Sequence, residues 1–164
     1  MLGAQRRKAA LVMSGHKNKY MELALKEAEK AALRGEVPVG AVIVAGDSGA
    51  VIAVASNRVM EDRDPSAHAE LLAIRAACAA LGSERLPGCD LYVTLEPCPM
   101  CAQLISFARL RRLYFAADDP KGGGVENGPR VLHASSCHHQ PEIYGGIGAR
   151  PAAQMLKKFF QARR

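Results

Sequence analysis

Two short stretches of the sequence bring together the residue types that hold a catalytic metal. His68-Ala69-Glu70 supplies an imidazole and a carboxylate, and Cys98-Pro99-Met100-Cys101 supplies two thiols three residues apart. One His and two Cys are three ligands for zinc, which leaves the fourth tetrahedral position to water and lowers the pKa of that water to about 7. Glu70 is spare to the ligand set and can serve as a general acid and base, so the pattern predicts metal-assisted hydrolysis.

The neighbouring residues are predicted to place both stretches at helix N-termini. Asp64-Pro65-Ser66 offers a capping residue before the periodic apolar run 67–81, so we expect His68 in the first turn of a helix. The apolar run 91–95 indicates a buried strand, and Pro97 marks the turn into a second helix over 98–108. The positive end of that helix favours thiolate over thiol, which is the form that binds metal.

Each stretch taken alone allows other interpretations. A C-x-x-C also occurs in redox dithiols and structural zinc knuckles, although the second C-x-x-C of a zinc ribbon is absent from this sequence. His-x-Glu followed by Pro-Cys-x-x-Cys is the described signature of the zinc deaminases. The combination therefore favours a deaminase with one Zn²⁺ per chain over a redox protein or a non-catalytic zinc module that binds RNA.

The remaining patterns predict an α/β fold. Helices are expected over 18–34 and 150–162, a hairpin over 39–45 and 51–55, and a strand, helix, strand unit over 90–95, 98–108 and 112–116. Such a unit gives a parallel pair of strands, so we expect a three-layer α/β/α sandwich with a mixed sheet. The site should lie at the carboxyl ends of the strands, bordered by the Gly- and Pro-rich loop 118–129.

Length and composition indicate one domain in a reducing compartment. The chain has 164 residues, 49% of them hydrophobic, which we interpret as a single domain over 18–164 after a disordered leader over 1–17. Five Cys without a secretory signal predict a cytoplasmic protein, and the N-terminal apolar run 9–13 is too short for a membrane span. The net charge of +6 favours an anionic partner such as nucleic acid.

Several other chemistry-bearing residues are predicted to be structural. Cys137-His138-His139 is dense in metal-ligand types, but adjacent side chains diverge and no further partner completes a set, so we expect no second metal. Cys78 is expected in the core and Cys89 in a turn, and the pair Phe159-Phe160 is expected to pack the last helix.

Three segments resemble the bacterial tRNA-specific adenosine deaminases of the cytidine deaminase superfamily: 64–70, 91–102 and 36–42. The resemblance implies a five-stranded, cytidine deaminase-like sheet and a homodimer with sites near the interface. It also implies conversion of adenosine to inosine at the wobble position of a tRNA anticodon. The family's zinc ligands match His68, Cys98 and Cys101, its proton shuttle Glu70, and its substrate contacts Asn57, Ala69, Asp119 and Lys121.

The C-terminal part departs from the family pattern at His138-His139, Gly145-Gly146, Pro151 and Gln161. These departures leave the zinc chemistry untouched and concern the edge expected to contact RNA. They leave open a second interpretation, a deaminase of a free nucleobase or nucleoside of the guanine or cytosine type. Asn57 likewise has a simpler alternative role as a polar cap at the end of a strand.

Overall fold

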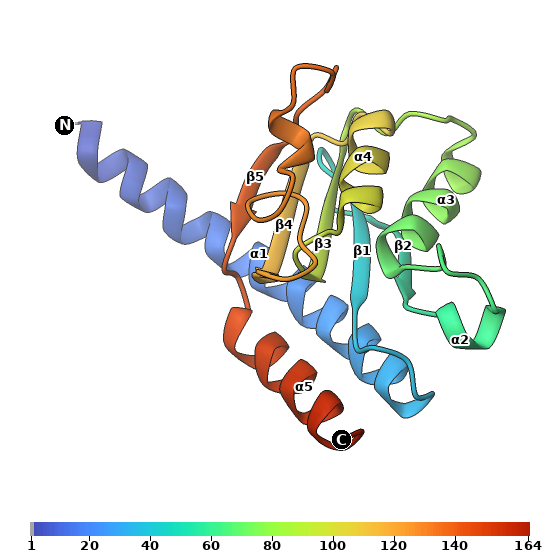
Figure 1. Ribbon diagram of the computed structural model, residues 1–164. Coiled ribbons are helices and arrows are strands. Elements are labelled where there is room, and N and C mark those ends of the chain that lie inside the picture. The colour runs from blue at the N-terminus through green and yellow to red at the C-terminus, as the bar shows by residue number, and fades with distance from the viewer. Residues whose placement is uncertain (1) are drawn as a thin grey trace.

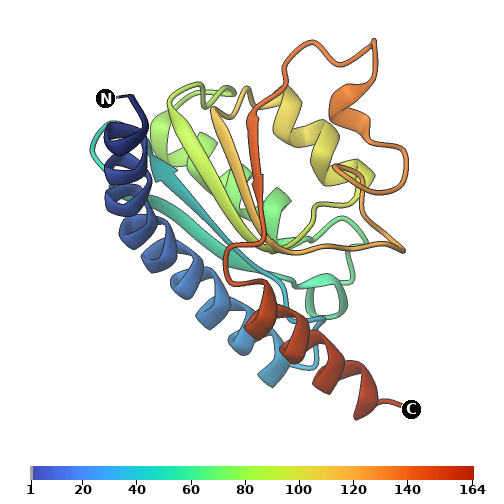
Figure 2. The same cartoon turned by 90° about the vertical axis from the view of Figure 1, so that its left-hand side faces the viewer.

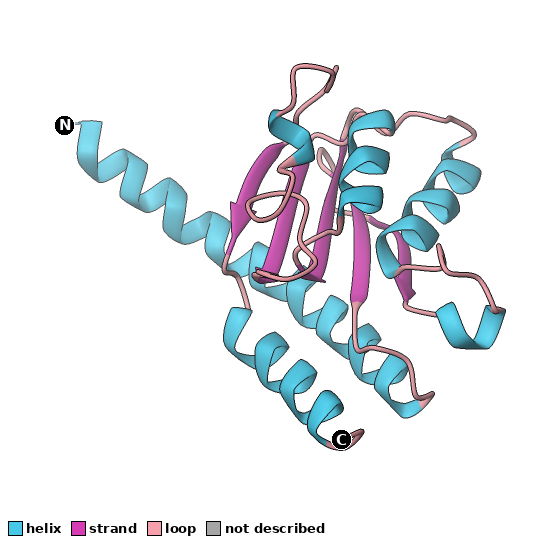
Figure 3. Ribbon diagram, in the orientation of Figure 1, coloured by secondary structure: helices cyan, strands magenta, loops and turns pink. Residues whose placement is uncertain are grey.

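The protein is built around one mixed, five-stranded β-sheet (Figures 1 and 3). The computed structural model describes residues 2–164, with side chains from residue 18 onward. The strands are β1 Gly40–Ala45, β2 Val51–Ser56, β3 Cys89–Leu95, β4 Arg112–Ala117 and β5 Glu142–Gly145, in the order β2-β1-β3-β4-β5. β1 is antiparallel to β2 and β3, whereas β3, β4 and β5 run parallel. The predicted hairpin and parallel pair are both confirmed.

Helices cover both faces of the sheet, as Figure 2 shows in side view. α1 (Leu2–Leu33) and α5 (Ala149–Gln161) lie on one face, and α3 (Ala69–Leu81) and α4 (Pro99–Phe107) on the other. The short α2 (Val59–Asp62) and the 3₁₀ turn Val131–His133 lie in the connections. The predicted three-layer sandwich is therefore confirmed. Among the described residues, no helix has the length and apolar character needed to cross a membrane.

Two buried clusters hold the layers together. The larger lies between the sheet and α3 and α4, and includes Ile74, Leu91, Ile105 and Phe115. The smaller lies under α1 and α5. There Gly40 allows β1 to approach α1 so closely that a Cβ at this position would collide with the backbone of the helix. Because both faces of β3 are covered, most of its side chains are buried, which explains the continuous apolar run in the sequence.

Some predicted boundaries differ from the structure. α1 begins at Leu2 instead of near Asn18, although the leader expected over 1–17 lies outside the residues with described side chains and stays a prediction. The expectation that Cys89 lies in a turn is wrong, because this buried residue opens β3 and pairs with Ala45. Of the two C-terminal phenylalanines, Phe159 is buried as predicted, whereas Phe160 is about half exposed.

Candidate active site

Three metal-binding side chains meet where the N-termini of α3 and α4 approach each other. His68 is the N-cap of α3, one position before the predicted first turn, and Cys98 is the N-cap of α4. Both sulfurs, of Cys98 and of Cys101 in the first turn of α4, lie 3.6 Å from His68 Nδ1. Tetrahedral zinc, with bonds of about 2.3 Å to sulfur and about 2.0–2.1 Å to nitrogen, requires N···S separations of roughly 3.5 Å. The three ligand atoms therefore fit a zinc ion.

Hydrogen bonds link the three side chains of the cluster to one another. The two thiols share a hydrogen bond, which lowers the pKa of Cys98 to about 4 and raises the pKa of Cys101. A hydrogen bond with Cys98 raises the pKa of His68. The Cys98 thiolate is thus held beside two proton donors, Cys101 and His68. A metal ion that binds here replaces their protons. Among the described residues, this is the one group of His, Cys and carboxylate side chains arranged to hold a metal.

Glu70 is enclosed at the same point and is not part of the ligand cluster. It lies in the first turn of α3 with 4% of its surface exposed, and it lines the cavity with His68 and Cys98. Burial raises the pKa of Glu70 to about 7, because a buried carboxyl loses the hydration that stabilises its charged form. A carboxyl in this position can exchange protons with a molecule held beside the metal site.

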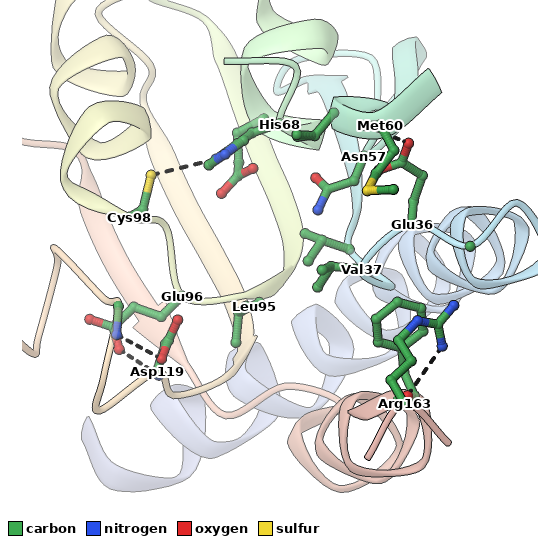
Figure 4. A pocket seen from close by; sticks show the side chains of 16 residues that line it. Glu36, Val37, Asn57, Met60, His68, Leu95, Glu96, Cys98, Asp119 and Arg163 are labelled. Atoms are coloured by element: carbon green, nitrogen blue, oxygen red, sulfur yellow. Dashed lines mark hydrogen bonds between the residues drawn. The ribbon is translucent and has the colours of Figure 1, made fainter. Parts of the chain in front are cut away.

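Asn57, which follows β2, is bonded to the start of α3 and lines the cavity, so its substrate contact stays a prediction. Its Oδ1 accepts a hydrogen bond of 2.9 Å from the backbone N–H of Ala69, so it caps α3 next to His68. Its amide also faces the cavity in Figure 4. The backbone of Asn57 is held in turn, since Arg34 Nη2 donates to its carbonyl oxygen at 3.0 Å. Asn57 can therefore orient the ligand helix and present an amide to a bound molecule.

A cavity of about 650 Å³ opens over these groups, lined by segments distant in the sequence (Figure 4). One side is α2, whose backbone N–H groups at Met60 and Glu61 donate to the buried Glu36 carboxylate at 2.8 Å. Opposite the metal cluster lies the end of α5, where the Arg163 guanidinium stacks 3.5 Å from the centre of the Phe159 ring. Sequence patterns did not single out Glu36, Phe159 or Arg163 as site residues.

The loop after β4 forms another side of the cavity, as expected from its length and composition. Asp119 and Gly122 line the cavity, together with Glu96 from the turn after β3. Lys121 is exposed and is not among the lining residues, and Ala69 is fully buried with its N–H bonded to Asn57. The structure thus brings Asn57 and Asp119 to the cavity, while roles for Ala69 and Lys121 stay predictions.

The second dense group of metal-ligand types, Cys137-His138-His139, is engaged in local bonding. The Cys137 thiol donates to the carbonyl oxygen of His139, and His139 Nε2 lies 2.6 Å from the carbonyl oxygen of Leu110. The contact with Leu110 ties the segment before β5 to the connection between α4 and β4, and Cys137 Sγ also lies 3.3 Å from Ser106 Oγ of α4. Cys78 packs partly buried against the larger core cluster, in agreement with its predicted structural role.

Comparisons with known proteins place this site in a family. The family model described as the cytidine and deoxycytidylate deaminase zinc-binding region matches residues 14–117. The tRNA-specific adenosine deaminase of Agrobacterium fabrum is 57% identical over 88% of this chain and 94% of its own length. The chain therefore belongs to the cytidine and deoxycytidylate deaminase family, whose members bind zinc through this region. It is a zinc-dependent hydrolytic deaminase with one zinc per chain.

Solved structures agree with the fold. A structure from a study of A-to-I editing by tRNA:A34 deaminases has a TM-score of 0.82 and 57% identity, covering 84% of this chain and 99% of that one. A guanine deaminase from Nitrosomonas europaea has a TM-score of 0.71 at 24% identity, covering 87% of this chain and 83% of its own. At 24% identity, the second similarity concerns the fold alone.

Proposed function

We propose that this deaminase converts adenosine to inosine at the wobble position of a tRNA anticodon, in the cytoplasm. The observation that carries the proposal is the buried carboxylate of Glu70, enclosed beside a His-Cys-Cys set that can hold zinc, in a chain 57% identical to a tRNA-specific adenosine deaminase. The cytoplasmic assignment is supported by the five cysteines, none of which is in a disulfide bond, because a reducing compartment keeps thiols in this form.

In the proposed mechanism, His68, Cys98 and Cys101 hold the zinc, which acts when bound as a Lewis acid toward the attacking water. Glu70 takes a proton from that water as its oxygen attacks C6 of the adenine, the carbon that bears the amino group. Glu70 delivers this proton to N1. It then takes the second proton from the new hydroxyl on C6 and gives it to the amine, so that the C6–N bond breaks, ammonia leaves and the C6 carbonyl of inosine forms. Because Glu70 is buried, bulk water has little access to these proton transfers.

The cavity offers contacts suited to a nucleotide that has been turned out of an RNA loop. The amide of Asn57 and the backbone around Ala69 are proposed to bind the base, and Asp119 and Lys121 to contact the neighbouring nucleotides. Arg163 adds a cation at the rim near α5, where a phosphate group could bind. Turning out a base costs a few kcal/mol and least in a single-stranded loop, which favours an anticodon loop as substrate.

The proposal is tested by assaying the zinc-loaded enzyme on two classes of substrate. One is an anticodon stem-loop with adenosine at the wobble position. The other is a panel of free adenine, guanine and cytosine with their nucleosides. We expect ammonia release and inosine from the stem-loop alone, because only the RNA occupies both the base pocket and the charged rim. Turnover of a free base with the RNA unchanged would instead support a nucleobase deaminase, the second interpretation of the sequence.

The enzyme is further proposed to be a homodimer that associates through α4. Met100 and Phe107 lie seven residues apart and so on one side of this helix, and they are 39% and 64% exposed. Met100 precedes a zinc ligand, so a second copy packed here would lie near the active site.

We expect light scattering to give twice the mass of one chain, and Phe107→Asp to give a monomer. Leu33→Asp, at an exposed leucine on α1, should leave the dimer intact. A monomeric wild-type enzyme would contradict the proposal.

A further inference from the structure

Glu96 makes an unusual set of contacts for a residue outside the proposed reaction. It lies between β3 and Cys98, and only 2% of its surface is exposed. Its Oε1 accepts hydrogen bonds from three consecutive backbone N–H groups, at 3.2 Å from Val125, 2.8 Å from Glu126 and 2.9 Å from Asn127. Its Oε2 accepts two more, at 2.9 Å from the Asp119 N–H and 2.7 Å from the Asn127 side chain. One carboxylate thus binds both ends of the loop segment 119–127.

The backbone next to Glu96 holds the same loop. The N–H of Gly124 donates to the carbonyl oxygen of Pro97 at 2.8 Å, and the Gly124 carbonyl accepts from Val131 at 2.8 Å. A Cβ on Gly124 would lie 2.6 Å from the Cα of Pro99, the first residue of α4. The loop is therefore packed directly against the turn that carries the zinc ligand Cys98.

These contacts determine where Asp119 stands. Its N–H is bound by Glu96, and its Oδ1 accepts from the N–H of Gly122 at 2.9 Å, which folds the start of the loop into a tight turn. Figure 4 shows Glu96 and Asp119 together at one end of the cavity, on the side away from Arg163. Glu96 itself is not placed to take part in proton transfer, because five donors already occupy its two oxygens.

We propose that Glu96 is a positioning residue that holds the loop 118–130 in place. With the loop fixed, Asp119 lines one wall of the active site and contacts the RNA next to the target base. This inference rests on the proposed tRNA substrate for its effect on catalysis. Its structural part, the anchoring of the loop, stands independently of any substrate. A rigid wall removes the entropy cost of ordering the loop when RNA binds, so Glu96 should influence affinity more than the chemical step.

The test compares Glu96→Gln with Glu126→Gln, which makes the same chemical change on an exposed carboxylate of the same loop. Glutamine replaces one acceptor oxygen by a donor that must face N–H groups, and it removes the charge that strengthens the remaining bonds. In the absence of substrate, we expect hydrogen exchange of the backbone amides at 119 and 125–127 to rise at least about tenfold, equivalent to about 1.4 kcal/mol. Glu126→Gln should leave the exchange rates unchanged. Unchanged rates in Glu96→Gln would overturn the inference whatever the substrate is.

Steady-state kinetics then test the effect on the substrate. With the anticodon stem-loop, Glu96→Gln should raise KM about tenfold and change kcat by less than about threefold, with one zinc per chain retained. Faster exchange with an unchanged KM would overturn the assignment of the wall to RNA binding. A fall in kcat with loss of zinc would mean that Glu96 supports the metal site instead.

A second variant covers the case in which Glu96→Gln does not fold. Asn127→Ala removes one of the five bonds, that of the Asn127 side chain to Oε2, without placing a donor against the buried backbone. We expect a smaller rise in exchange confined to the same loop, and a rise in KM in the same direction. Exchange and KM equal to those of the wild type would contradict the inference.

Discussion

Glu70→Gln is expected to lower kcat for deamination by about 10²- to 10⁴-fold, the usual contribution of a general acid and base, while one zinc per chain is retained. Glutamine has nearly the same shape as glutamate but cannot accept and return a proton. The residue is 4% exposed, and replacing a buried charge by a neutral amide removes a desolvation cost, so the variant should stay folded. The measurements are ammonia release under single-turnover conditions and zinc content by elemental analysis.

The matched control is Glu84→Gln, which makes the same substitution on an exposed glutamate just after α3. It should retain both zinc and wild-type turnover, because its side chain lies outside the cavity. Loss of zinc in Glu70→Gln would show that Glu70 belongs to the ligand set. Full activity in that variant would mean that another group moves the protons.

Much of the fold was predictable because its buried strands are apolar runs bounded by turn-forming residues. β1 and β3 are largely apolar runs with Gly or Pro within two residues of each end, and β4 is an apolar run followed by Asp118, Asp119 and Pro120. The predicted limits of all three strands fall within one residue of the observed ones. β5 gives no comparable signal. It is a four-residue edge strand with mostly exposed side chains, so no apolar run or alternation distinguishes it from the loop before it. The five-stranded sheet was expected only from the family resemblance.

The metal cluster was predictable for a different reason. Its ligands lie close to turn residues, and the short spacings constrain their direction, so local rules place His68, Cys98 and Cys101 at two helix starts. The rest of the cavity is formed by tertiary contacts. Phe159 and Arg163 reach the cavity because α5 packs beside α1 and β4, which no local pattern encodes. Glu96 resembles an ordinary turn residue until its five hydrogen bonds to a distant loop are seen.

Cys101→Ala is expected to weaken zinc binding by more than about 100-fold. Removing a residue that only hydrogen-bonds a metal ligand lowers affinity by up to about 100-fold, and removing a ligand itself should cost more. Cys101 is fully buried and lies 3.6 Å from His68 Nδ1, so no water can easily replace its sulfur. The matched control is Cys78→Ala, at a half-buried cysteine of α3 outside the cluster, which should keep one zinc per chain and its activity. Stoichiometric zinc in Cys101→Ala would contradict the assigned ligand set.

Removal of zinc from the wild-type enzyme separates a catalytic metal from a structural one. The larger core cluster is formed by apolar side chains from the sheet, α3 and α4, so we expect the protein to stay folded without the metal, unlike a zinc finger. We expect a chelator to abolish activity and lower Tm, because the folded state loses a bound ligand, while circular dichroism at 25 °C is unchanged. Added zinc should restore both. As a control, the chelator should leave the Tm of Cys101→Ala unaltered. Loss of secondary structure in the chelated wild-type enzyme would show instead that the zinc holds the fold together.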